Sequence, residues 1–72
     1  TTTTAQLLEP LTTRQREILS QAYYDGYFEE PRAINATELA DRFGIARATF
    51  TQHLRTAQRK LFGTIFSQEG RR

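Results

Sequence analysis

The segment spanning residues 35–55 constrains the fold more than any other part of the chain, because its small and apolar residues recur at the intervals of two helices joined by a sharp turn. Ala40 is small enough for two helix backbones to approach each other, and Gly44 can adopt the positive φ that ends a helix. The apolar contacts between the two helices are expected to come from Leu39, Phe43, Ile45, Phe50 and Leu54. This spacing predicts a helix over about 36–43 and another that begins near 47.

A short scaffold helix, a tight turn and a second helix packed steeply across it together define the helix-turn-helix, whose second helix enters the DNA major groove. The residue pattern therefore predicts a DNA-binding motif. It carries no information on the base sequence of the target.

Two capping boxes locate the helix starts. Thr12 precedes Gln15 by three residues, and Asn35 precedes Glu38 by the same interval, as expected when a side chain at each position bonds the backbone amide of the other. Gly26 should end the first helix, and Pro31 excludes a helix from the loop that follows. The sequence thus predicts an all-α, three-helix bundle with helices at about 13–25, 36–43 and 47–62 or longer.

The length and composition allow one small domain without covalent or metal support. Among 72 residues there is no cysteine and one histidine, His53, so neither a disulfide nor a zinc site is expected. No apolar run is long enough for a transmembrane helix or a signal peptide, which favours a soluble, cytoplasmic chain. Paired carboxylates, a nucleophile with a base, and a phosphate-binding glycine loop are not recognisable, so no enzyme activity and no cofactor are predicted. The predicted organisation is a flexible lead at 1–8, the DNA-binding domain at 9–66 and a tail at 67–72.

Charge is distributed unevenly along the chain, although the net charge is only +2. Residues 1–41 contain three basic and seven acidic side chains, whereas residues 42–68 contain five basic and no acidic side chains. The positive charge therefore begins where the second half of the motif begins. A domain polarised in this way can present one face to a polyanion such as DNA, and the alternative is an accidental segregation of charge on a solvated surface.

One face of the predicted last helix has a composition suited to the major groove. Arginine can bond two acceptors of guanine, glutamine can pair with the edge of adenine, and threonine or alanine can contact the thymine methyl group. The candidates for base contacts are Arg47, Ala48, Thr51, Gln52 and Arg55. The candidates for phosphate contacts are Arg32, Thr37, Arg42, Arg59 and Lys60.

The predicted core stripe of the last helix consists of Phe50, Leu54, Ala57, Leu61 and Ile65. Two aromatic residues near the end of this helix, Phe62 and Phe66, lie away from the stripe. A monomer would leave both exposed, so a second copy of the chain or an absent domain is expected to cover them, unless the helix bends or stops near Gly63. They also define an alternative to the DNA-binding interpretation. In this alternative, the helix-turn-helix is only the scaffold of a protein-docking or dimerisation module.

Three segments together resemble the bacterio-opsin-activator type of helix-turn-helix domain found in haloarchaeal regulators. They are Leu-Thr-Thr-Arg-Gln at 11–15, Gly-Tyr-Phe-Glu-Glu-Pro-Arg at 26–32 and Gln-His-Leu-Arg-Thr-Ala at 52–57. The resemblance extends from Leu11 to Phe66 and implies a carboxy-terminal DNA-binding module of transcription regulators, often preceded by a sensor domain. Ala46 departs from the pattern, because such motifs commonly place a serine there to cap the recognition helix.

Overall fold

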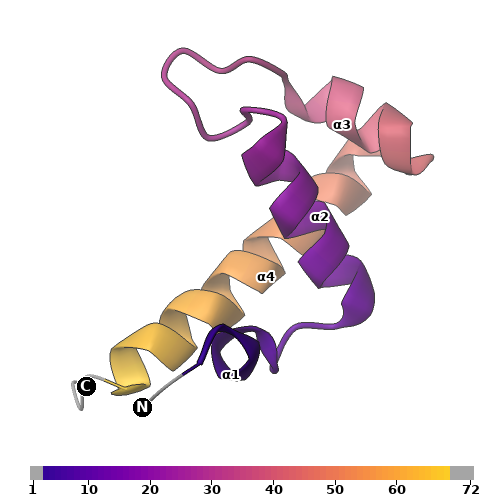
Figure 1. Cartoon of the computed structure of the whole chain (residues 1–72). Helices are drawn as coiled ribbons and strands as arrows, with labels where there is room; N and C mark the ends of the chain where they lie inside the picture. The colour runs from indigo at the N-terminus through magenta and orange to yellow at the C-terminus, as the bar shows by residue number, and fades with distance from the viewer. Residues whose placement is uncertain (1–2, 69–72) are drawn as a thin grey trace.

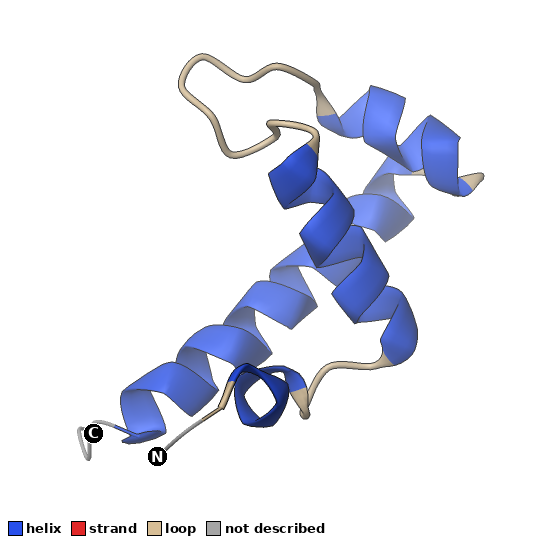
Figure 2. Cartoon of the chain, in the orientation of Figure 1, coloured by secondary structure: helices blue, strands red, loops and turns tan. Residues whose placement is uncertain are grey.

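The computed structural model describes residues 3–68. Within these residues it contains four helices and no strand, with the helices joined by loops and turns (Figure 2). In chain order the helices are α1 (Thr4–Leu8), α2 (Thr13–Tyr24), α3 (Ala36–Phe43) and α4 (Arg47–Gln68). Helix α2 crosses α4, and α3 packs against the first part of α4 (Figure 1). The predicted all-α fold is confirmed.

Both predicted capping boxes are present. At the start of α2, the hydroxyl of Thr12 accepts a bond from the backbone amide of Gln15 at 3.1 Å, and the side-chain oxygen of Gln15 accepts one from the amide of Thr12 at 3.0 Å. Asn35 and Glu38 make the same pair of bonds at the start of α3, at 2.8 and 3.2 Å. These bonds satisfy amide groups that have no partner inside the helix, and they therefore set where each helix begins.

A glycine with positive φ lies at or just after the carboxyl end of both α2 and α3, close to the predicted positions. Helix α3 ends at Gly44, whose φ of 68° lies in the left-handed region. The next amide, that of Ile45, bonds the carbonyl of Ala40 at 3.0 Å and turns the chain toward α4. Helix α2 ends at Tyr24, one residue before the predicted end, and is followed by Gly26 with a φ of 86°.

The core lies where α2, α3 and α4 meet. Its largest fully buried side chains are Ile18, Leu39 and Phe50, one from each of these helices. Ala40 is only 1% exposed, as expected for the point where the backbones of α3 and α4 approach. The predicted core stripe of α4 is buried at Phe50, Leu54 and Ala57, whereas Leu61 and Ile65 are half-buried.

Helix α1 is the main difference from the three-helix prediction, which left residues 1–8 out of the fold. Its start is a third capping box, in which Thr3 and Gln6 bond each other's backbone amides. It packs beside the last turns of α4 (Figure 1) and half-buries Leu7 and Leu8. Helix α1 forms because the domain offers it an apolar surface, since five residues are too few for a stable isolated helix.

Helix α4 is longer than the minimum predicted and runs for 22 residues to Gln68. It continues through Gly63, so the alternative that the helix stops there is wrong. The predicted tail at 67–72 is helical at its first two residues, and residues 69–72 lie outside the part that the structure describes. None of the helices within 3–68 combines the length and the apolar character needed to cross a bilayer.

Candidate nucleic-acid interface

The geometry of a helix-turn-helix is formed by α3, the connection Gly44–Ala46 and α4. The connection is short because Gly44 reverses the chain within one residue, and Ile45 then packs on the core as a partly buried side chain. Leu39 and Phe50 are completely buried between the helices. The orientation of α4 on α3 is therefore determined by close packing, and the opposite side of α4 is left free.

The five predicted base contacts lie together on this free side of α4. They line one shallow depression of 370 Å³ with Thr56, and all but Thr51 are exposed. The hydroxyl of Thr51 donates to the backbone carbonyl of Arg47 at 2.9 Å, so its hydrogen is already used within the helix. Thr51 is thus better suited to a methyl contact than to donating a hydrogen bond to a base.

A second depression, of 310 Å³, separates this face from the loop after α2. The loop contributes Tyr27, Phe28 and Arg32, and α4 contributes Thr51, Leu54, Arg55 and Gln58. Arg32 and Arg55 therefore flank the same cleft, and no carboxylate lines it. Because the cleft is open to solvent and has positive charge on both sides, it is suitable for an anionic group such as a phosphate.

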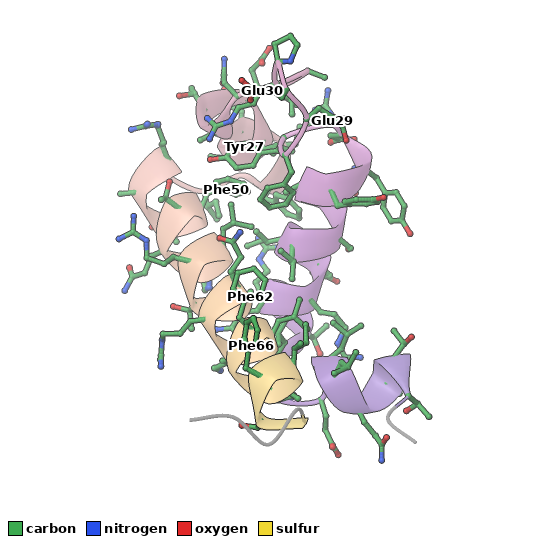
Figure 3. All side chains as sticks on the ribbon, turned by 90° about the vertical axis from the view of Figure 1, so that its left-hand side faces the viewer. Tyr27, Glu29, Glu30, Phe50, Phe62 and Phe66 are labelled. Atoms are coloured by element: carbon green, nitrogen blue, oxygen red, sulfur yellow. The ribbon has the colours of Figure 1, made fainter. Side chains whose placement is uncertain are left out.

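The ring of Tyr27 packs against the guanidinium group of Arg32. The guanidinium carbon of Arg32 lies 4.3 Å from the centre of the Tyr27 ring, which in turn packs edge-on against Phe50 at 6.0 Å between ring centres. Figure 3 shows Tyr27 above Phe50, between the loop and α4. Tyr27 thus folds back onto the core, whereas Phe28 remains 42% exposed.

The other predicted phosphate contacts differ in how freely they can reach a ligand. Thr37 and Arg59 are exposed. Arg42 forms an ion pair with Asp25, with 2.7 Å between the nitrogen and the carboxylate oxygen. Lys60 bonds the side-chain oxygen of Gln15 at 3.2 Å, on the side of α4 that faces α2. The structure thus does not bring Lys60 to the face of the base-contact candidates.

Arg14 is a basic residue near the motif for which the sequence pattern predicts no role. Its guanidinium donates to the last carbonyl of α3, that of Phe43, at 3.2 Å and lies 5.0 Å from the centre of the Phe43 ring. A cation at this position stabilises the carboxyl end of a helix. The two residues are 29 positions apart, and no sequence pattern connects them.

The buried crossing of α3 and α4, the short turn between them and the exposed polar face of α4 define a helix-turn-helix domain of the DNA-binding class. The chain belongs to the family of helix-turn-helix DNA-binding domains whose model matches residues 11–63. Its loop after α2 lies within the matched region.

Relatives of the chain come from haloarchaea. It is 56% identical over 57 residues to the transcriptional regulator NarO of Haloferax volcanii, and 41% identical over 63 residues to the bacterioopsin transcriptional activator of Halobacterium salinarum. It is 36% identical over 62 residues to the dimethyl sulfoxide reductase transcriptional activator of Haloferax volcanii. These alignments cover 79%, 88% and 86% of this chain but only 27%, 9% and 29% of the three relatives. No solved structure matches the chain significantly.

The sequence-based resemblance to haloarchaeal regulators is therefore confirmed. The chain is a DNA-binding domain, and it corresponds to less than a third of each relative's length.

Proposed function

We propose that this chain acts in transcription regulation by binding double-stranded DNA in a sequence-specific manner, with the first half of α4 in the major groove. The observation that carries the proposal is the single exposed face formed by the five base-contact candidates, opposite the face that packs on α2 and α3. A helix of this kind presents its amino-terminal residues to base edges.

Each side chain of that face has a role that follows from its chemistry. Arg47 and Arg55 would bond guanine, Gln52 would pair with adenine, and Ala48 and Thr51 would contact thymine methyl groups.

The phosphate contacts are proposed for Arg32, Thr37, Arg42, Arg59 and Lys60. Arg32, Thr37 and Arg59 could act without rearrangement, because they are exposed and carry no ion pair in the described part of the chain. Arg42 would first have to leave Asp25 or share it, and Lys60 would have to leave Gln15. We therefore expect the first three to contribute more to affinity than the last two.

The wider setting of the domain is proposed from its relatives, which are named as transcriptional regulators and activators and are several times longer. We propose that an amino-terminal sensor domain accompanies the domain in the intact regulator. Because the target would be chromosomal DNA, the proposed place of action is the cytoplasm, in association with the nucleoid.

The test is a fluorescence-anisotropy titration of a labelled random-sequence duplex at several salt concentrations. Binding should weaken steeply as salt rises, because counterions are released from the phosphates. The variant with Arg47, Gln52 and Arg55 all replaced by alanine should bind more weakly. Thr13→Ala is the control, because its exposed side chain at the start of α2 lines neither depression beside the base-contact candidates, and it should bind almost as the wild type. A folded wild-type chain that shows no salt-dependent binding would refute the proposal.

Single variants then separate base contacts from phosphate contacts. Arg55→Ala should lower binding to a selected target by about 1–3 kcal/mol and relax the preference at one base pair. Arg59→Ala should weaken binding to all sequences equally and reduce the salt dependence by about one phosphate equivalent. An equal loss on every sequence for Arg55→Ala would reassign that residue to phosphate.

A further inference from the structure

An apolar groove runs between α2 and the second half of α4. Its volume is 420 Å³, and it is lined mainly by Leu8, Leu19, Tyr23, Tyr24, Leu61 and Phe62. Phe66 is 54% exposed and follows Phe62 by one helical turn. In Figure 3 the two phenylalanines lie one below the other along α4.

Three aromatic side chains at this groove are largely exposed. Tyr24 is 78%, Tyr23 is 62% and Phe62 is 49% exposed. Single exposed aromatic residues are common, but these belong to one continuous surface. Continuous apolar surface of this kind usually marks a protein interface.

The position of the groove along α4 allows a second copy of the chain as its occupant. Phe62 and Phe66 follow Arg55 by seven and eleven residues, which places them on the same side of the helix as the base-contact candidates. At 1.5 Å per residue, they lie about 15–22 Å along the axis from Thr51 and Gln52, the centre of the face formed by the base-contact candidates, which we call the reading face. A two-fold axis at the phenylalanines would place the two reading faces no more than about 30–44 Å apart. This limit allows the 34–36 Å between successive major grooves on one side of B-DNA.

Charge at the two ends of the groove favours the same occupant. Arg16 lines the end next to α1, and Glu29 and Glu30 follow Phe28 on the loop at the other end (Figure 3). None of the three forms an ion pair within residues 3–68. A two-fold axis reverses the direction of the groove, so the basic end of one copy would face the acidic end of the other.

We propose that this groove is the two-fold interface between two copies of the chain, which places their α4 helices in successive major grooves of one DNA duplex. The inference rests on the proposed function for its DNA geometry, whereas the contact itself can be measured without DNA. The dimer would use a target of two inverted half-sites about 10 base pairs apart.

The first experiment measures the mass of the 72-residue chain by light scattering or sedimentation equilibrium, from micromolar to millimolar concentration. The wild type should approach twice its 8.3 kDa mass. Phe62→Glu and Tyr24→Glu should raise the dimer dissociation constant at least tenfold, because each buries a charge in the interface. Ser67→Glu is the matched control, since it adds the same charge on a different side of α4 and should dimerise as the wild type does. Helical circular dichroism must show that all variants are folded.

The second experiment selects binding sites from a pool of random duplexes. The wild type should enrich inverted pairs of half-sites, and Phe62→Glu should enrich single half-sites. A wild-type chain that stays at 8.3 kDa over the whole concentration range would overturn the inference. Wild-type enrichment of single half-sites alone would overturn it as well. A dimer that binds no DNA would instead refute the proposed function while leaving the interface intact.

Discussion

The two glycines with positive φ allow a paired test of which contact determines the conformation of the loop between α2 and α3. Gly26 and Gly44 have φ angles of 86° and 68°, so alanine is strained at both positions. They differ in what a methyl group would meet. A Cβ atom added at Gly44 would meet no atom within 4 Å apart from its own chain neighbours. A Cβ atom added at Gly26 would lie 2.6 Å from the Cβ atom of Ala33.

The expected costs follow from this difference. Alanine in the left-handed region costs about 1–2 kcal/mol, which is the whole effect expected for Gly44→Ala. At Gly26 the same conformational cost applies, and the contact with Ala33 adds about 1–3 kcal/mol because the loop must shift to relieve it. The free energy of unfolding of a 72-residue domain is only about 4–11 kcal/mol, so Gly26→Ala should remove a large part of it.

Thermal and urea unfolding followed by circular dichroism would measure both variants. The difference between them should be at least 1 kcal/mol, or roughly 4 °C or more in Tm. The double variant Gly26→Ala with Ala33→Gly removes the contact and should recover part of the loss. Equal destabilisation by the two single variants, or no recovery in the double variant, would show that the contact with Ala33 does not determine the loop.

Three further substitutions test other parts of the fold by the same unfolding measurements. Asn35→Ala should cost about 1 kcal/mol because the amide of Glu38 loses its capping partner, and a change below 0.3 kcal/mol would contradict the importance of this cap. Phe50→Ala should cost about 3–5 kcal/mol and leave the domain largely unfolded at 37 °C, since the Phe50 side chain is completely buried. A cooperative unfolding transition close to that of the wild type would refute the central place of Phe50 in the core. Gly63→Ala should stabilise the chain by about 1 kcal/mol, because the new methyl group meets no atom within 4 Å and the residue lies inside a helix. Destabilisation would indicate that this side of α4 is covered in solution.

The sequence predicted the parts of the structure that depend on neighbouring residues. The caps at Thr12 and Asn35 involve residues three positions apart, and the reversal at Gly44 depends on one residue's backbone freedom. The face of base-contact candidates follows from helical periodicity alone. For these features no knowledge of tertiary structure was needed.

The features that the sequence did not predict depend on residues distant in the chain. Helix α1 forms against α4, and Arg16 donates to its carbonyl at Leu8, 3.2 Å away. Lys60 was assigned to phosphate, yet its partner Gln15 lies 45 positions earlier. Arg42 likewise pairs with Asp25 across 17 positions. A periodicity argument identifies which side of a helix a residue occupies, but it does not identify which other helix lies against that side.

The continuity of α4 gives the domain a mechanical property. The reading face and the exposed phenylalanines belong to one unbroken helix of 22 residues, about 33 Å long. A tilt of about 10° around its midpoint would displace each end by about 3 Å, close to the rise of one base pair. With α4 in the major groove as proposed, a small rotation imposed at one end of this continuous helix would change the alignment of side chains with base pairs at the other.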